Sequence, residues 1–241
     1  MADDLKGKVA LITGAARGLG LLIAEDLSRH GALVAGADMR GDLLAKAMAR
    51  VAGEQGGETL AVTVDAREEG QVVAGVADVY ARWGRIDILI NNAGVRKVAP
   101  VDEIDTDMWD EIHSTNLRGQ FLFTREVLKQ GMRAQNEGTI IFISSGSGRR
   151  GEQSSATYCS SKFGGVGFAE SCAKDLKATK IRVTTIAPGM IWTPMAEESE
   201  VAHLDLEWLD PKHVANAVRF CIQQDADTII PELHIYHRAQ I

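Results

Sequence analysis

The chain has 241 residues, 45% of them hydrophobic and 24% charged, which is the composition of a soluble globular protein with one sizeable core. A net charge of −7 disfavours nucleic acid and anionic lipid surfaces as partners, because both require a basic face. No apolar run is long enough to span a bilayer, the acidic N-terminus does not resemble a signal peptide, and the three cysteines lack metal-ligand spacing, so we expect a cytoplasmic protein with no metal site and no membrane contact.

Short apolar segments alternate with segments of helical pattern along the chain. Strands are expected at residues 8–13, 32–38, 59–64, 86–90, 139–144, 181–186 and 232–236. Helices are expected at residues 18–30, after the second strand through about 52, and at 68–83, 103–134, 157–178 and 211–224. Because such strands are apolar on both sides, they predict an α/β fold with a doubly wound parallel sheet (Rossmann fold) in a single domain, residues 1–241. Residues 190–210 lack this pattern, and we expect them to form a flexible flap near the site.

The first predicted strand ends in a glycine-rich turn from which a helix begins. The turn contains Gly14, Arg17, Gly18, Leu19 and Gly20. Glycines let the backbone approach a pyrophosphate, and the helix N-terminus favours its negative charge. The spacing is Gly-x3-Gly-x-Gly rather than the commoner Gly-x-Gly-x-x-Gly. A tight turn alone would explain the glycines, but the residue at the end of the second strand supports dinucleotide binding.

That residue is Asp38. Its carboxylate can accept hydrogen bonds from both hydroxyls of a ribose and would repel a 2′-phosphate, so NAD is favoured as the cofactor. Arg17 and Arg40 act in the other direction, because either guanidinium can pair with a 2′-phosphate. We expect Asp38 to prevail, with NADP as the second candidate.

Two further loops follow predicted strands. Asp65 follows the third strand and could accept a hydrogen bond from an adenine amino group. Residues 91–94, Asn-Asn-Ala-Gly, follow the fourth strand, where a doubly wound sheet binds its ligand. Taken alone, a solvated aspartate and a plain turn would explain these residues as well.

Tyr158 and Lys162 are four residues apart on a predicted helix and therefore share a face. An ammonium beside a phenol favours the phenolate and lowers its pKa, so the tyrosine could exchange a proton near neutral pH. Ser145 ends the fifth strand, and its hydroxyl could hold a substrate oxygen. Tyr-x-x-x-Lys is a common pattern, so this interpretation depends on the glycine turn and Asp38.

These motifs together resemble those of the short-chain dehydrogenase/reductase family over nearly the whole chain. The resemblance is carried in order by the glycine turn, Asp65, residues 91–94, Asn116 within Ser-Thr-Asn-Leu, Ser145, Tyr158 with Lys162, and Pro188-Gly189 with Thr193. It implies transfer of hydride between a nicotinamide cofactor and a secondary alcohol or ketone. It also implies that Tyr158 is the acid/base, that Ser145 polarises the substrate oxygen, that Lys162 lowers the pKa of Tyr158, and that Asn116 holds a water in a proton relay.

The resemblance further implies the cofactor contacts and an assembly. Contacts are expected from Gly14, Arg17, Gly18, Leu19, Gly20, Asp38, Asp65, Ala66, Asn92, Ala93, Gly94, Tyr158, Lys162, Pro188, Gly189, the backbone of Ile191, and Thr193. Members of the family are commonly tetramers, so a homotetramer, or a dimer, is expected to pack through the helices near 103–134 and 157–178.

Some features leave alternatives open. Residues 230–237 depart from the Gly-Gln and Asp-Gly-Gly pattern that many members have near their last strand. Arg96, Arg149 and Arg150 could attract an acidic small-molecule substrate, although solvated surface arginines are the simpler explanation. One alternative function is an NADPH-dependent reductase of 3-oxoacyl groups. Another is a non-catalytic nucleotide-binding regulator on the same fold, against which the intact Asn, Ser, Tyr and Lys set argues.

Overall fold

The computed structural model describes residues 5–199 and 207–241. Within them the chain forms a parallel sheet in the order β3-β2-β1-β4-β5-β6-β7. The strands are β1 (Val9–Thr13), β2 (Leu33–Asp38), β3 (Thr59–Thr63), β4 (Ile88–Asn91), β5 (Glu137–Ile143), β6 (Lys180–Pro188) and β7 (Glu232–Ile235). All seven predicted strands are present, so the doubly wound α/β fold is confirmed.

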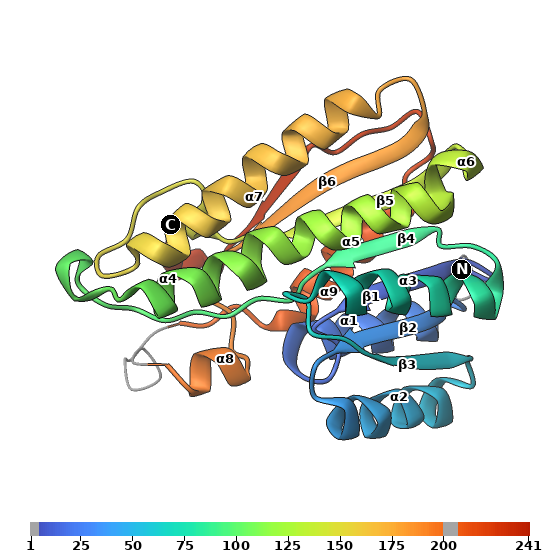
Figure 1. Ribbon diagram of the computed structural model, residues 1–241, viewed down its shortest axis with the longest axis horizontal. Coiled ribbons are helices and arrows are strands. Elements are labelled where there is room, and N and C mark those ends of the chain that lie inside the picture. Colours follow the sequence, from blue (N-terminus) through green and yellow to red (C-terminus); the bar gives the residue numbers. More distant parts are fainter. Residues whose placement is uncertain (1–4, 200–206) are drawn as a thin grey trace.

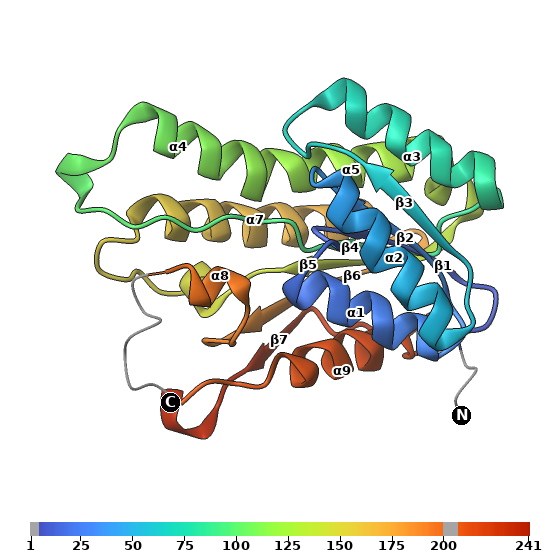
Figure 2. The same ribbon diagram turned by 90° about the horizontal axis from the view of Figure 1, so that it is seen from below.

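Helices cover both faces of the sheet (Figure 1). They are α1 (Gly18–Arg29), α2 (Gly41–Gln55), α3 (Glu69–Trp83), α4 (Thr106–His113), α5 (Gly119–Val127), α6 (Arg133–Gln135), α7 (Ala156–Asp175), α8 (Pro194–Glu197) and α9 (Pro211–Ile222). Figure 2 shows α1, α2 and α9 on one face and α3, α5 and α7 on the other. Each face encloses its own apolar core, which is why the strands are apolar on both sides.

Two π-helical turns, Ser114–Arg118 and Leu128–Met132, join α4, α5 and α6 into one helical path. This path corresponds to the helical pattern predicted over 103–134. A π turn inside a helix is rare and is frequently found at functional sites. The first of the two turns contains Asn116.

Two differences from the sequence expectations concern the predicted flap at 190–210. The short helix α8 begins at Pro194 and was not predicted, because four residues are too few to show a periodic pattern. Residues 200–206 of the predicted flap lie outside the described residues. On either side of them, Ile191 and Leu209 pair as an isolated parallel bridge, so the described parts of this segment adjoin one another.

The strand order changes direction between β1 and β4, which lie side by side at the centre of the sheet. Connections leave this point toward opposite edges, so the loops after the two strands separate and leave a crevice between them. The fold therefore places the ligand site at the carboxyl ends of the central strands.

Candidate active site

A cavity of about 620 Å³ lies at this edge of the sheet. The predicted site residues line it, with the exception of Asn116. They are Gly14, Arg17, Gly18, Leu19, Gly20, Asp38, Asp65, Ala66, Asn92, Ala93, Gly94, Ser145, Tyr158, Lys162, Pro188, Gly189, Ile191 and Thr193. The fold thus brings residues from 14 to 193 around one space, which has the size of a cofactor site.

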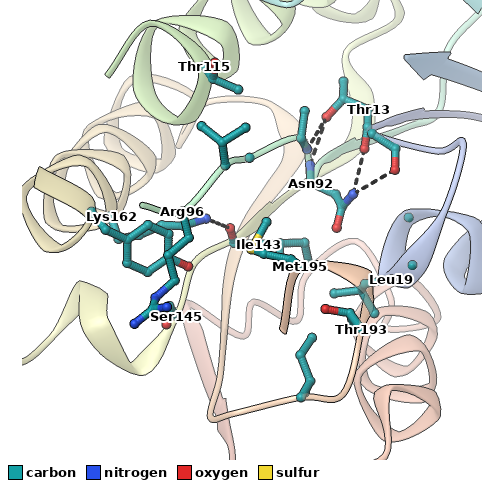
Figure 3. Close-up of a pocket in the computed structure, with 18 of the residues that line it drawn as sticks. Thr13, Leu19, Asn92, Arg96, Thr115, Ile143, Ser145, Lys162, Thr193 and Met195 are labelled. Atoms are coloured by element: carbon teal, nitrogen blue, oxygen red, sulfur yellow. Dashed lines mark hydrogen bonds between the residues drawn. The ribbon is translucent and has the colours of Figure 1, made fainter. Parts of the chain in front are cut away.

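The glycine turn and the loop after β4 are held together by Thr13 and Asn92 (Figure 3). The Thr13 hydroxyl accepts hydrogen bonds at 2.9 Å from the backbone N–H groups of Asn92 and Ala93. The Asn92 amide donates to the Thr13 carbonyl at 2.8 Å. Thr13 received no role from the sequence, because only the pairing of the two loops makes it a shared anchor.

Gly20 lies where a side chain would contact both loops. A Cβ at Gly20 would lie 2.2 Å from the Gly14 carbonyl oxygen and 2.6 Å from the Asn92 amide nitrogen. Gly14 itself has φ +68°, a conformation that favours glycine. Gly14 therefore provides the turn, and Gly20 provides the close packing of the two loops.

Asp38 ends β2 and is only 6% exposed. Its carboxylate accepts hydrogen bonds from the backbone of Ala16 at 3.2 Å and from the Arg40 guanidinium at 2.9 Å through both Nε and Nη2. Burial acts to raise the pKa of Asp38, but the hydrogen bonds and charge of Arg40 outweigh it and hold the pKa below its usual value. Asp38 is therefore ionised at neutral pH, with Arg40 as its counter-ion.

The other charged residues at this end are also paired. Asp65 accepts hydrogen bonds from Arg67, at 2.6 Å for the shortest, and this pairing lowers the pKa of Asp65. Arg17 extends from the glycine turn to Glu198, just after α8. The Arg17–Glu198 ion pair joins the predicted flap to the turn that would hold the pyrophosphate.

Ser145 and Tyr158 approach each other at the other end of the cavity. Ser145 follows β5 and begins a short 3₁₀ turn, in which its hydroxyl accepts a hydrogen bond from the Ser147 N–H at 3.2 Å. Tyr158 lies in the first turn of α7, is 8% exposed, and is close enough to Ser145 for that hydroxyl to act to lower the pKa of Tyr158. A substrate oxygen placed between them would contact both hydroxyl groups.

Lys162 lies one turn further along α7 and is 5% exposed. Its Nζ lies 5.7 Å from the centre of the Tyr158 ring and donates a hydrogen bond to the Ile143 carbonyl at 3.0 Å (Figure 3). Burial lowers the pKa of Lys162 to about 8. The shared helical face predicted for Tyr158 and Lys162 is therefore present.

The predicted lowering of the Tyr158 pKa is wrong for the protein on its own. Burial raises the pKa of Tyr158 to about 12, although the Ser145 hydrogen bond and the positive charge of Arg96 act to lower it. The Arg96 guanidinium carbon lies 5.9 Å from the centre of the Tyr158 ring. Desolvation of the phenolate dominates because the ring is enclosed, an effect that spacing along a helix does not reveal.

Asn116 is fully buried in the π turn and does not line the cavity. Its Oδ1 accepts from the Val95 N–H at 2.8 Å, and its Nδ2 donates to the Val95 carbonyl at 2.9 Å and the Ser161 hydroxyl at 3.1 Å. Asn116 thus holds the chain that follows Gly94 and contacts Ser161, the residue before Lys162. Its predicted role in a proton relay stays a prediction.

The three arginines expected near the mouth of the site are placed differently from one another. Arg96 and Arg150 line the cavity. Arg149 does not line the cavity but pairs with Glu232 at 2.6 Å and Glu170 at 2.7 Å. Arg149 therefore has a structural role, which ties the loop after β5 to the start of β7.

No group of three or more His, Cys, Asp and Glu side chains among the described residues could hold a metal ion. The helices of the described segments are also too short or too polar to cross a membrane. The cysteines are unpaired, and burial raises the pKa of the Cys159, Cys172 and Cys221 thiols. Their thiols are therefore poorly suited to act as nucleophiles.

Comparison with known proteins agrees with this geometry. The family model described as short chain dehydrogenase matches residues 8–203. Cyclopentanol dehydrogenase of Comamonas testosteroni is 35% identical over 232 residues, which cover 92% of this chain and 92% of that protein. Sorbitol dehydrogenase of Cereibacter sphaeroides is 36% identical over 187 residues, which cover 78% of this chain and 72% of that protein.

Solved structures of reductases are also similar to this chain over nearly its whole length. Levodione reductase superimposes with a TM-score of 0.89 at 31% identity and covers 96% of both chains. A variant of actinorhodin polyketide ketoreductase with NADPH has a TM-score of 0.89 at 30% identity and covers 98% of both chains. The chain therefore belongs to the short-chain dehydrogenase/reductase family, as a nicotinamide-dependent oxidoreductase of alcohols and ketones.

Proposed function

We propose that the chain transfers hydride between NAD and a secondary alcohol or ketone, with Tyr158 as the acid/base. The observation that carries this proposal is the meeting of Ser145 and Tyr158 in the same cavity as the glycine turn. A cofactor whose pyrophosphate lies at the glycine turn would reach the two hydroxyl groups along this cavity. Fixing the reacting groups in one space is a large part of what such a site contributes to the rate.

Each catalytic side chain has a distinct part. Tyr158 accepts the alcohol proton during oxidation and returns it during reduction, while Ser145 holds the substrate oxygen. Lys162, charged below its pKa of about 8, stabilises the phenolate from the same face of α7. Asn116 fixes the Val95 backbone beside the site and supports a proton relay to solvent.

A bound nicotinamide cofactor supplies the hydride donor or acceptor. The glycine turn fits its pyrophosphate, because Gly14, Gly18 and Gly20 line the cavity at the N-terminus of α1 and present no side chain there. Pro188, Gly189, Ile191 and Thr193 would border the nicotinamide ring.

NAD is preferred in this proposal because the ionised, buried Asp38 carboxylate repels a 2′-phosphate. Arg40 offsets part of that repulsion, since it lies 2.9 Å from the same carboxylate. The NADPH-dependent reductase of 3-oxoacyl groups is therefore the second candidate, and Arg40 and Arg17 are the residues that favour it. The non-catalytic regulator is disfavoured, because a binding protein has no need of Ser145, Tyr158 and Lys162 together.

A spectrophotometric assay tests the proposal. The purified protein is mixed with NAD or NADP and a panel of cyclic and linear secondary alcohols, and reduced nicotinamide is followed by absorbance. We expect turnover that is faster with NAD. If the protein binds NADH but neither oxidises any of the alcohols nor reduces the matching ketones, the non-catalytic nucleotide-binding regulator is favoured instead.

We also propose a cytoplasmic homotetramer, or a dimer, that packs through α4, α5 and α7. Trp109, Phe121 and Phe163 support this arrangement, because they are 38–45% exposed on these helices. Light scattering with size-exclusion chromatography measures the assembly directly. A monomer at micromolar concentration would contradict this part of the proposal.

A further inference from the structure

The chain that follows β7 returns to the edge of the candidate active site, and its role could not be predicted from the sequence. Ile235 pairs in register with Pro188, and the Gly189 N–H donates to the Ile235 carbonyl at 2.8 Å. Figure 2 shows the chain continuing beyond the end of β7 to the point marked C. Residues 236–241 therefore lie against the segment at which the predicted flap begins.

Gln240 makes the main contact. Its Oε1 accepts a hydrogen bond from the Met190 N–H at 3.1 Å, and its Nε2 donates to the Met190 carbonyl at 3.0 Å. The two ends of one side-chain amide thus bind both backbone polar groups of one residue, as a neighbouring strand would. The same Nε2 donates to the Glu207 carbonyl at 2.7 Å. Gln240 consequently joins the outgoing and returning parts of the flap segment.

The packing around these hydrogen bonds is close. A Cβ at Gly189 would lie 2.2 Å from the Gln240 Oε1 and 2.6 Å from the ring of Tyr236. Tyr236 also contacts the other wall, since a Cβ at Gly146, next to Ser145, would lie 3.1 Å from its hydroxyl. Neither Tyr236 nor Gln240 lines the cavity, whereas Gly189, Met190 and Ile191 do.

We propose that Gln240 is a positioning residue that fixes the backbone of Gly189–Ile191 and thereby sets the affinity for the nicotinamide cofactor. The proposal rests on the proposed function in one respect, namely that this backbone borders the nicotinamide. It acts through Met190, because the side-chain amide itself does not reach the cavity. It also gives a role to the end of the segment after β7, which follows the residues 230–237 that depart from the common family pattern.

Two substitutions separate the contribution of the Gln240 amide oxygen, which accepts a hydrogen bond, from that of the amide nitrogen, which donates. Gln240→Ala removes all three hydrogen bonds. Gln240→Glu keeps an acceptor for the Met190 N–H but places a carboxylate against the carbonyl oxygens of Met190 and Glu207. Gln224→Ala is the matched control. Gln224 lies just beyond the end of α9, and its amide donates a single 2.7 Å hydrogen bond to the Phe220 carbonyl. Binding of NADH is measured by fluorescence, and exchange of the Met190 amide hydrogen is measured by mass spectrometry. Steady-state kinetics gives kcat and the KM for cofactor separately.

We expect Gln240→Ala to weaken NADH binding and raise the KM for cofactor about 5- to 30-fold, with a smaller change in kcat. This range corresponds to the net free energy that a few hydrogen bonds contribute. Gln240→Glu should be at least as impaired, and both variants should exchange the Met190 amide hydrogen faster. Gln224→Ala should match the wild type. Unchanged NADH affinity and KM in both Gln240 variants would overturn the inference, even if their melting temperatures fall. If the wild type binds no nicotinamide cofactor, the proposed function fails, and the effect of Gln240 on cofactor affinity fails with it. Faster Met190 exchange in the two variants would then support only the positioning of this backbone by Gln240, and unchanged exchange would overturn that part as well.

Discussion

Tyr158 illustrates how far a single residue depends on its surroundings. Its position four residues before Lys162 is visible in the sequence, but its pKa is set by burial beneath the loops that close the cavity. A pKa of about 12 leaves the hydroxyl protonated at neutral pH in the protein alone. In the proposed mechanism, oxidation then requires additional stabilisation of the phenolate, which we propose that the charge of Lys162 supplies.

The first prediction concerns the proton on Tyr158. Tyr158→Phe keeps the ring and removes the hydroxyl, so turnover should fall by at least ~10²–10⁴-fold while NADH binding is little changed. Tyr80→Phe is the control, because Tyr80 is partly buried and also has a pKa of about 12, but its hydroxyl donates to the Val127 carbonyl away from the site. Steady-state kinetics on both variants checks the prediction. Near-normal turnover in Tyr158→Phe would remove this residue from the mechanism.

The second prediction concerns the charge on Lys162. Its folded-state pKa of about 8 lies below the ordinary 10.5, so the folded protein releases a proton that the unfolded chain retains between these values. The cost of burying the charge is therefore complete below about pH 8 and decreases as the pH rises toward 10.5. The stability of Lys162→Met relative to the wild type should accordingly be greatest near pH 7 and decline toward pH 10.

Denaturant unfolding of both proteins across this pH range measures the difference in the free energy of unfolding. The same variant should oxidise alcohol more slowly, and the inflection of its rate against pH should move upward, because the phenolate loses a neighbouring charge. A stability difference that does not change between pH 7 and pH 10 would show that Lys162 is not buried as a cation.

The third prediction concerns cofactor choice at Asp38. Asp38→Ala removes the carboxylate and leaves Arg40 and Arg17 in place, so kcat/KM should shift toward NADP. Each arginine can contribute roughly 1.5–3 kcal/mol through a charge-assisted hydrogen bond. Comparing kcat/KM for NAD and NADP in both proteins gives the shift. If the wild type already prefers NADP and the variant does not change that preference, Asp38 does not select the cofactor.

At the scale of elements, the site depends on how closely the turn into α1 and the loop after β4 approach each other. The two loops share hydrogen bonds through Thr13 and Asn92, and Gly20 lies between them. The π turn between α4 and α5 has a related function, since it presents Asn116 to the backbone of Val95. Both features fix backbone positions around the cavity rather than contribute reactive groups.

The fourth prediction follows from that approach. Gly20→Ala would place a Cβ 2.2 Å from the Gly14 carbonyl oxygen, so the turn and the Asn92 loop must separate. We expect at least a tenfold loss of NADH affinity together with a lower melting temperature. The control is Gly53→Ala in α2, where a Cβ would meet nothing within 4 Å and where alanine should stabilise the helix by up to ~1 kcal/mol. Equal behaviour of the two variants would contradict the close approach.

For the molecule as a whole, the two layers of helices are held to the sheet by apolar cores and by a few pairs between distant segments. Asp26 of α1 and Arg219 of α9 are 193 residues apart in sequence and form an ion pair at 2.9 Å. Asp26 is only 7% exposed. This pair joins the first and the last helix of the fold on one face of the sheet.

The fifth prediction tests that pair. Arg219→Ala removes the principal partner of a buried carboxylate and should lower the free energy of unfolding by roughly 1–3 kcal/mol. For a chain of this size the melting temperature should fall by roughly 2–4 °C per kcal/mol. Thermal unfolding followed by circular dichroism measures the change, and activity at low temperature should be retained. Arg133→Ala, on α6, serves as a surface arginine control.

The order of strands and helices along the chain and many of the residues that line the cavity could be predicted from the sequence. Apolar runs of strand length indicate burial on both faces, which only a sheet between two layers of helices provides. Strand ends and helical spacing identify Gly14, Asp38, Ser145 and Tyr158. These positions depend on one element only, so the packing of the elements does not change them. Boundaries such as Ile88 at the start of β4 differed by a few residues because strand ends depend on their partners.

The remaining features could not be predicted from the sequence, because each of them depends on contacts between residues far apart in the chain. Arg149 binds Glu170 and Glu232 instead of facing the cavity, and Gln240 binds Met190 across 50 residues. The pKa of Tyr158 rises rather than falls, because desolvation depends on the whole enclosure and not on helical spacing. Periodicity and motif spacing show which residues share a face or an end of one element. Ion pairing and burial depend instead on how all the helices and strands pack together.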